Sequence, residues 1–324
     1  MQRILDPAQI EAFGQQRSVP RLRLPDPATV FRRRAQRLRA LSDGHSLGDY
    51  LALMAVLSEA QDRELARLAS YPGPSASDAA ESQARIQRAR EHDLPVLQAL
   101  GWPRDQRWRR VLAELCASVA PHAPETVREI CRRLPAEDPA QLEKQADCVL
   151  AVSFERLDVQ AAPFIMAALQ VYWVHLATQL DSAVTQELEA AQNRASHAPV
   201  AGVCPVCGTL PVASIVRADP QFHGYRYLSC GLCASEWHLI RIKCSHCLAT
   251  EGIRYHLVEG GSEAIRAESC ETCRTYRKIL YQEKDVAVEP LADDLGSLAL
   301  DLLMSAESYR RAIGNPLLWQ PCAD

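Results

Sequence analysis

Four C-x-x-C pairs, all between residues 204 and 273, constrain the fold of this chain more than any other feature of its sequence. The unit C-x2-C-x22-C-x2-C occurs twice with a period of 40 residues. Two cysteines three residues apart can wrap a tight turn that points both sulfurs at one ion, and two such turns complete a tetrahedron. The sequence therefore predicts two four-cysteine metal sites in a duplicated module. The expected ligands are Cys204, Cys207, Cys230 and Cys233 in the first site, and Cys244, Cys247, Cys270 and Cys273 in the second.

The compartment decides how paired cysteines are interpreted. The N-terminal stretch MQRILDPAQIEAFGQQR lacks the apolar run of a secretory signal, and no apolar run in the chain is long enough to span a membrane. We therefore expect a cytoplasmic protein without membrane contact, whose thiols stay reduced. Under those conditions, cysteine pairs indicate metal ligands more often than disulfides. A thioredoxin-type redox motif needs one pair in a βαβ context, which four pairs without that context do not provide.

The four turns differ at the residue after the second cysteine. Gly208 occupies this place in the first turn, whereas Ala234, Leu248 and Arg274 occupy it in the others. Glycine adopts positive φ freely, so that backbone N–H groups can point at sulfur. We therefore expect the second site, which has no such glycine, to be more exposed or more labile than the first. The spacing accepts zinc or iron equally.

The remaining pattern predicts a mainly α protein with a small metal-bound β region, in which a helical bundle is joined to two tandem rubredoxin-like or zinc-ribbon-like modules. Helical periodicity, punctuated by prolines, ends before the first cysteine pair, and short β-type runs then alternate with the pairs. The expected domains are an extended N-terminal arm at 1–28, a helical bundle at 29–192, a linker at 193–203, the first metal module at 204–242, the second at 243–285, and a C-terminal helix and tail at 286–324.

Individual helices follow from caps and apolar spacing. Ser46, with Asp49 three residues on, predicts the start of one helix. Further helices are expected at about 81–100, 107–119, 124–134, 139–157 and 161–192, and the last, which is apolar over more than one stripe, is expected at the centre of the bundle. One more helix is expected in LADDLGSLALDLLMSAESYRRAIGNP, with Leu295, Leu298, Leu302 and Tyr309 on one side.

Several other residues allow a functional and a plainer interpretation. Since each site already has four thiolates, the nearby histidines favour surface or supporting roles over ligation. The plainer role of the tryptophan is packing, and the plainer role of the three arginines is to form a solvated helix face. The two aspartates are expected in the first turn of a helix in any case, and the isolated cysteines are expected to be buried thiols. These residues are His238, His246, His256, Trp237, Arg32, Arg33, Arg34, Asp293, Asp294, Cys116, Cys131 and Cys148; Cys322 is also isolated.

Several blocks of the sequence resemble the FdhE family of formate dehydrogenase accessory proteins. These are CPVCG, SCGLCASEWHLIRIKCSHC, CETCRTY and ADDLGSLALDLLM, with FRRRAQRLRALSDGHSLGDYLALMAVLSEAQ near the N-terminus. The resemblance covers most of the chain. It implies a cytoplasmic maturation factor that contacts the catalytic subunit of respiratory formate dehydrogenase before export. It also implies two rubredoxin-like sites, at the eight cysteines, that can hold iron. The spacing alone names neither this client nor the metal.

Two other classes of function compete with this interpretation. A zinc-ribbon protein that binds nucleic acid or another protein would interleave basic and aromatic residues, as YRYLSC, HLIRIK and TYRK do, but the net charge of −4 disfavours nucleic acid as the partner. A thiol-redox protein is the second alternative. No nucleophile–base pair, phosphate loop or pair of catalytic carboxylates is found, so we expect a binding protein and not an enzyme. The oligomeric state stays open.

Overall fold

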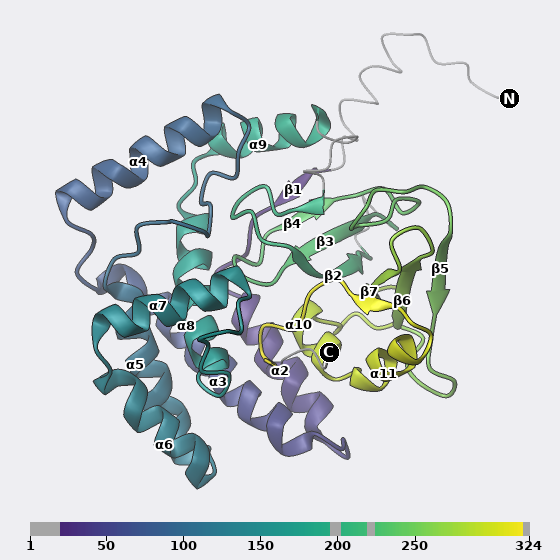
Figure 1. Cartoon of the computed structure of the whole chain (residues 1–324), viewed down its shortest axis with the longest axis horizontal. Coiled ribbons are helices and arrows are strands. Elements are labelled where there is room, and N and C mark those ends of the chain that lie inside the picture. The colour runs from purple at the N-terminus through teal and green to yellow at the C-terminus, as the bar shows by residue number, and fades with distance from the viewer. Residues whose placement is uncertain (1–19, 195–201, 219–223, 320–324) are drawn as a thin grey trace, which may run out of the picture.

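The computed structural model describes residues 20–194, 202–218 and 224–319, and it places a helical region beside a single β-sheet (Figure 1). The predicted class is confirmed: the protein is mainly α, with a small β region that carries both groups of four cysteines. The helices of the helical region are α2 (Val30–Ser42), α3 (Gly48–Arg67), α4 (Ala76–Glu91), α5 (Arg107–Val119), α6 (Glu125–Arg133), α7 (Pro139–Ala151), α8 (Ala162–Thr178) and α9 (Ser182–Arg194), with short 3-10 turns at Leu68–Ser70, Ala120–His122 and Leu134–Ala136.

Helix α8 is the centre of the helical region, as its sequence predicts. Almost every side chain of APFIMAALQVYWVHLAT is buried, and the helix packs against α3, α5 and α7. The helix predicted at 161–192 is nevertheless two helices. The Asp181 side chain accepts a hydrogen bond of 2.8 Å from the backbone N–H of Val184, and this cap begins α9 as a separate helix.

Several other helix ends differ from the prediction. Helix α4 begins earlier than expected, because Ser75 accepts a hydrogen bond from the backbone N–H of Asp78 and caps it, and it ends at Glu91, so that residues 92–100 are not helical. Helix α7 ends at Ala151, because Val152 adopts the left-handed conformation with φ of 53°. The cap predicted at Ser46 is wrong: α3 begins at Gly48 without a side-chain cap.

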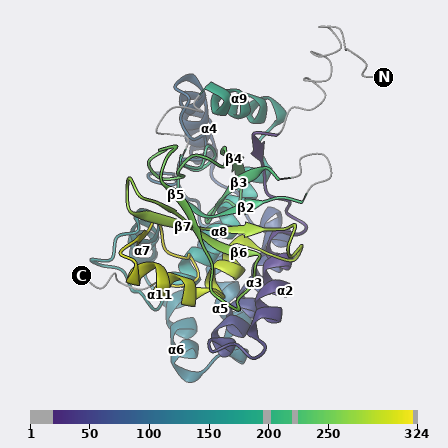
Figure 2. The same ribbon diagram turned by 90° about the vertical axis from the view of Figure 1, so that its right-hand side faces the viewer.

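The strands form one mixed sheet in the order β1-β4-β3-β2-β7-β6-β5, with β8 paired to β7. Strands β2 and β7 run parallel and pair Ser214 with Ile279 and Val216 with Tyr281, and this pairing joins the two cysteine modules into one sheet. Figure 2 shows the strands in front of the helical region. The bounds are β1 (Leu22–Arg23), β2 (Pro211–Val216), β3 (Arg226–Cys230), β4 (Glu236–His238), β5 (Ile253–His256), β6 (Ile265–Cys270), β7 (Thr275–Tyr281) and β8 (Arg310–Arg311).

The expected N-terminal arm contributes an edge strand to this sheet. Within residues 20–28, β1 pairs antiparallel with β4, and Leu22 lies opposite Trp237. Residues 1–19, most of the expected linker at 193–203, and Cys322 lie outside the described residues. Among the described helices, none has the length and apolarity needed to cross a bilayer.

The single C-terminal helix predicted after residue 290 is wrong. The chain forms α10 (Pro290–Leu295) and α11 (Leu298–Ala306), which are separated at Gly296. A Cβ atom at Gly296 would lie 3.0 Å from the end of the Leu41 side chain, so this position packs closely against α2. Leu302 is 73% exposed and so does not share the buried side expected for it.

Buried acidic side chains hold α10 in place. Asp293 lies in the first turn of the helix as expected, but both it and Asp294 also form buried ion pairs. Asp293 accepts hydrogen bonds of 3.0 and 2.6 Å from Arg37 of α2. Asp294 is 1% exposed and pairs with Lys278 of β7 and with Arg311 of β8. These ion pairs link α10 to both the helical region and the sheet.

Removing the charge of Asp294 tests how much this link stabilises the fold. Asp294→Asn would leave the buried ammonium of Lys278 and the guanidinium of Arg311 undercompensated, so we expect the free energy of unfolding to fall by about 3 kcal/mol. Urea unfolding followed by circular dichroism measures this change. Asp62→Asn, which breaks an exposed pair with Arg32, is the control and should lower stability by less than about 1 kcal/mol. Equal effects of the two substitutions would contradict the assignment.

Candidate metal centres

The first group of four cysteines joins two sharp turns of the first module. Cys204 and Cys207 lie in the turn before β2, and Cys230 and Cys233 lie in the turn between β3 and β4. The four Sγ atoms all lie within 4.8 Å of one another, with Cys204 Sγ 3.6 Å from Cys233 Sγ. An ion bonded to four sulfurs at about 2.3 Å in a tetrahedron separates neighbouring sulfurs by about 3.8 Å. The donor set therefore fits a tetrathiolate metal ion.

The second group repeats this arrangement. Cys244 and Cys247 lie in the turn after residue 243, and Cys270 and Cys273 lie in the turn between β6 and β7. Cys244 Sγ lies 3.8 Å from Cys273 Sγ, and Cys247 Sγ lies 3.7 Å from Cys270 Sγ. The two groups thus combine the first pair with the second and the third with the fourth, as the equal gaps of 22 residues predict. No histidine joins either group of ligand atoms within the described part of the chain.

All four turns have a left-handed residue after the second cysteine, so the expectation that only the turn with glycine adopts this conformation is wrong. The residue after the second cysteine has φ of 77° at Gly208, 56° at Ala234, 63° at Leu248 and 55° at Arg274. Its N–H returns to the carbonyl of the first cysteine at 2.8 Å for Gly208 and 2.9 Å for Arg274. The left-handed conformation costs about 1–2 kcal/mol at a residue with a Cβ, and the hydrogen bonds of the turn offset this cost.

Backbone N–H groups reach sulfur in both modules. Cys233 donates to Cys230 Sγ at 3.3 Å, and His246 donates to Cys244 Sγ at 3.3 Å. The amides therefore do not distinguish the second site from the first, contrary to the expectation built on glycine.

The two sites differ instead in solvent exposure. All four cysteines of the first site are buried, whereas Cys247 of the second is exposed and Cys273 is half-buried. The expectation that the second site is more exposed is thus confirmed, for a different reason. The helical region covers the first site: Leu97 donates its backbone N–H to Val206 at 2.8 Å, and Ala99 donates to Cys207 at 2.9 Å.

The sulfurs of each site differ in acidity. In the second site, burial raises the pKa of Cys244 to about 12. Burial also acts to raise the pKa of Cys270, but the backbone N–H groups of Cys273 and Thr272 outweigh it and lower this pKa to about 7. In the first site, burial raises the pKa of Cys204 well above its ordinary value. Because metal ligation needs thiolates, binding must release protons and must weaken as the pH falls.

The three candidate histidines occupy supporting positions. His238 Nδ1 accepts a hydrogen bond of 2.7 Å from Arg21, which requires a neutral ring, and burial lowers the pKa of His238 to about 4. His246 is exposed, and His256 lies 2.8 Å from the hydroxyl of Ser269. Trp237 is fully buried in β4, in keeping with a packing role.

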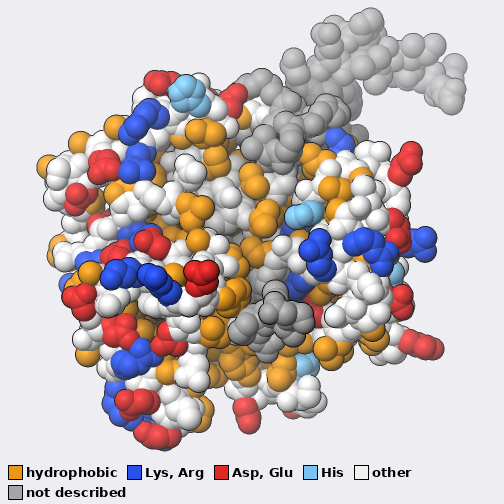
Figure 3. Space-filling view, viewed as in Figure 1, with side chains coloured by type: hydrophobic (Ala, Val, Ile, Leu, Met, Phe, Trp, Pro, Cys, Tyr) orange, Lys and Arg blue, Asp and Glu red, His pale blue; other side chains and the backbone are white. Residues whose placement is uncertain are grey.

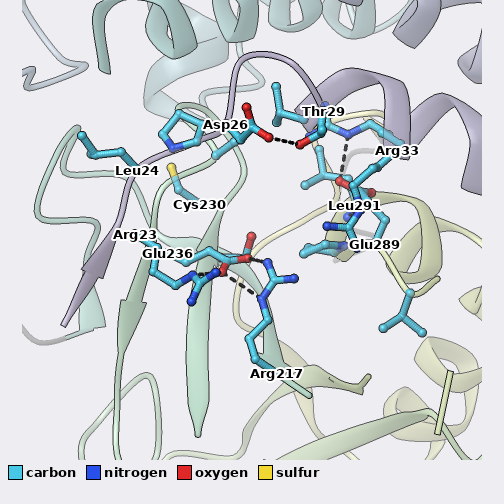
Figure 4. A pocket seen from close by; sticks show the side chains of 17 residues that line it. Arg23, Leu24, Asp26, Thr29, Arg33, Arg217, Cys230, Glu236, Glu289 and Leu291 are labelled. Carbon is cyan, nitrogen blue, oxygen red and sulfur yellow. Dashed lines mark hydrogen bonds and ion pairs between the residues drawn. The ribbon is translucent and has the colours of Figure 1, made fainter. Parts of the chain in front are cut away.

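A cavity of about 250 Å³ lies beside the first site (Figure 4). Cys230 lines it together with the ion pair between Arg217 and Glu236. The exposed Arg33 also lines this cavity, whereas Arg34 is 2% exposed and pairs with Glu289 at 3.1 Å. The basic run at residues 32–34 is therefore not a uniform solvated face, and its last member stabilises the interior.

Buried charges that no sequence pattern indicates lie between the two modules. Arg226 of β3 donates to Glu268 of β6 at 2.6 Å, and both side chains are inaccessible to solvent or nearly so. Arg277 of β7 is also buried, opposite Glu268 in the sheet. The strand pattern alone does not reveal such pairs, because they form between strands of different modules.

The surface of the second module offers apolar side chains close to its site. Ile242, two residues before Cys244, is 64% exposed, and Tyr255 of the edge strand β5 is 43% exposed. The Tyr255 hydroxyl reaches the carbonyl of Arg241 at 3.4 Å, which places this strand beside the segment that precedes Cys244.

On the face shown in Figure 3, basic and acidic side chains are interspersed over the helical region, so this part of the face has no extended basic surface for nucleic acid.

The fold and the two clusters define a class of protein in which a helical domain holds a sheet with twin four-cysteine modules. Comparisons with known proteins specify the family. The family descriptions "FdhE, N-terminal", "FdhE, central domain" and "FdhE, C-terminal domain" match residues 19–190, 203–241 and 242–318. The chain therefore belongs to the FdhE family.

Individual relatives agree over nearly the whole length. Protein FdhE of Salmonella paratyphi A is 38% identical over 301 residues, which cover 93% of this chain and 92% of the relative. A Protein FdhE homolog of Cronobacter sakazakii is 38% identical over 319 residues, covering 98% and 97%. The crystal structure of the FdhE protein from Pseudomonas aeruginosa superimposes with a TM-score of 0.78 at 35% identity, covering 92% of this chain and 99% of that one.

The difference in exposure predicts the order in which the cysteines react. When a chelator and iodoacetamide are added to metal-loaded protein, we expect Cys247 and Cys273 to be alkylated first and the cysteines of the first site much later. Mass spectrometry of peptides over time measures the order. Cys116, buried in the helical region, reports global unfolding and should react last. Simultaneous modification of all eight ligands would contradict the different accessibility of the two sites.

The environment of His238 predicts a dependence of stability on pH. Its folded-state pKa of about 4 lies below the ordinary value, so between about pH 6.5 and 4 the unfolded chain takes up a proton that the folded chain does not. The folded state is therefore destabilised progressively as the pH falls through this window, and His238→Gln should lack this component. Urea unfolding of both proteins at several pH values measures it. Both proteins contain the same cysteines, so the comparison removes the effect of acid on metal binding; parallel profiles would refute the prediction.

Proposed function

We propose that the protein is a cytoplasmic maturation factor that binds the catalytic subunit of formate dehydrogenase and turns over no substrate itself. The observation that carries this proposal is the combination of FdhE family membership over most of the chain with two groups of four cysteines. The family name supports the client, and the sulfur geometry supports metal-dependent folding or electron exchange.

We assign one metal ion to each group, with the eight cysteines as ligands. Four thiolates saturate the ion and leave no open coordination position, which suits structural support or one-electron exchange better than hydrolysis. The family resemblance favours iron, and zinc satisfies the same geometry. Metal analysis with a visible spectrum of the purified protein distinguishes the two, because ferric tetrathiolate is coloured and zinc tetrathiolate is not.

The two sites support different roles. The first is enclosed by the helical region, with the backbone of residues 95–99 hydrogen-bonded to its turn, so its loss would disturb the core that both regions share. The second lies in the part of the sheet that exposes Cys247 together with Ile242 and Tyr255. We therefore assign structural support to the first module, and contact with the client or electron exchange to the second.

Paired substitutions separate these roles. Replacing Cys204 and Cys207 with serine should lower the melting temperature and the amount of folded protein. Replacing Cys270 and Cys273 should leave a folded helical region but weaken client maturation, because the exposed module loses its metal. The measurements are thermal unfolding, a pull-down with the catalytic subunit, and formate oxidation in cells that carry each variant.

Cys148→Ser, at a half-buried cysteine outside both groups, is the matched control and should behave like the wild type. Full formate oxidation in cells that lack the protein would refute the proposed function. If both paired variants lose maturation equally at unchanged stability, the proposed client stands, but the proposal that the two sites have different roles is refuted.

A further inference from the structure

Arg277 occupies an unusual place beside the second group of cysteines. It lies in the middle of β7 and is 3% exposed. Its Nε–H donates a hydrogen bond of 2.9 Å to the hydroxyl of Ser245, which stands between Cys244 and Cys247 in the turn. The two terminal nitrogens of its guanidinium are buried and have no hydrogen-bond partner among the described residues. A buried cation held against a ligand turn with unused donors requires a compensating anion.

The neighbouring carboxylate does not supply the whole of this compensation. Glu268 faces Arg277 across the strand pair, but both of its oxygens accept hydrogen bonds from Arg226. Burial lowers the pKa of Arg277 to about 10; the charge of Glu268 opposes this shift, and the charges of Arg226 and Arg311 add to it. Ser245, which accepts the hydrogen bond from Arg277, directly follows Cys244, so the guanidinium lies against the turn that carries this cysteine. Two guanidinium groups and one carboxylate leave a net positive charge at this point.

A metal ion held by four thiolates has the charge that is missing. Four thiolates contribute four negative charges, so a divalent ion leaves a net charge of −2 and a trivalent ion a net charge of −1. We propose that Arg277 is the counter-charge of the second metal site, and that it stabilises the anionic tetrathiolate through its buried, otherwise unpartnered guanidinium. This inference rests on the proposed assignment of a metal to the second group of cysteines.

The duplication provides an internal comparison. With the period of 40 residues, Arg277 corresponds to Trp237, and its neighbours Glu268 and Ser245 correspond to Leu228 and Pro205. The strand register agrees, because Leu228 lies opposite Trp237 just as Glu268 lies opposite Arg277. Trp237 and Leu228 are fully buried.

The two modules therefore place different chemistry at equivalent strand positions. The first has an apolar pair there, and the second has a charged pair with a hydroxyl. If both sites hold iron, the added cation favours the reduced, more negative form at the second site, so that site should accept an electron more readily than the first.

The test replaces Arg277 with methionine in the full-length chain, which keeps much of the side-chain length and removes the charge. Zinc affinity is measured by competition with a chelator, and protection of Cys247 and Cys273 from alkylation identifies the second site. We expect the affinity of the second site to fall about 10- to 100-fold and that of the first site to remain unchanged. Arg254→Met, at a 69% exposed side chain of the same module, is the matched control and should change neither affinity.

A second measurement distinguishes a counter-charge from a merely structural arginine. Without metal, the guanidinium is a buried, incompletely paired cation, so Arg277→Met should leave the melting temperature equal or raise it. With zinc bound, the same substitution should lower the melting temperature. A structural role predicts a decrease in both states, and that result would overturn the proposal. Arg277→Lys keeps the charge and should retain more zinc affinity than Arg277→Met; equal losses would also overturn it.

The outcomes separate this inference from the proposed function. A wild-type protein that binds no metal at the second group would refute the metal assignment, and the role of Arg277 with it. If the wild type and the Arg277→Met variant bind zinc equally, the metal assignment stands and only the role of Arg277 as a counter-charge is refuted.

Discussion

The rest of the structure depends on the first group of four cysteines, where the helical region and the sheet meet. Residues 95–99 lie along its first turn with backbone hydrogen bonds to Val206 and Cys207, and the indole of Trp173 in α8 donates to the carbonyl of Leu97 at 3.0 Å. On the other side of the same site, Gln170 of α8 donates to the carbonyl of Gly231 at 2.6 Å. The most apolar helix is thus hydrogen-bonded directly to one cysteine turn of the first module, and through Leu97 to the other. The helical region and the first module share one hydrophobic core for this reason.

The second module depends on the first group of cysteines indirectly. Its strand β7 pairs in parallel with β2, so the two modules form one sheet and not two separate ribbons. Helix α10 reinforces the arrangement, because Asp293 pairs with Arg37 of the helical region and Asp294 pairs with Lys278 of β7. The second group of cysteines is thereby joined to the helical region through the sheet. Its exposure follows from the topology of the sheet and not from the residues of its own turns.

The parts of the fold that the sequence predicts are those that local geometry determines. The grouping of Cys204 with Cys233 follows from spacing, because a tight turn and a hairpin bring ligands together over short stretches. The central position of α8 follows from an apolar composition on all sides. The break at Gly296 and the pairing of β2 with β7 depend on residues far apart in the chain, such as Leu41 and Asp294, so they are not visible in a local pattern. The left-handed Leu248 and Arg274 show that a turn imposed by its ligands overrides the conformational preference of a single residue.

Duplication explains why the two sites differ although their turns are alike. Each turn must bring two sulfurs together, so the cysteines and the backbone conformation are equivalent in both copies although the surroundings differ. One copy is enclosed by the helical region and has Trp237 buried in its β4; the other exposes Cys247 and has Arg277 at the equivalent position. Enclosure in an apolar core favours a site that supports the fold, because water and partners are excluded from its sulfurs. Exposure together with a fixed positive charge favours a site whose own charge or contacts take part in function. Within one continuous sheet, the protein thus combines an enclosed group of four cysteines with a partly exposed one.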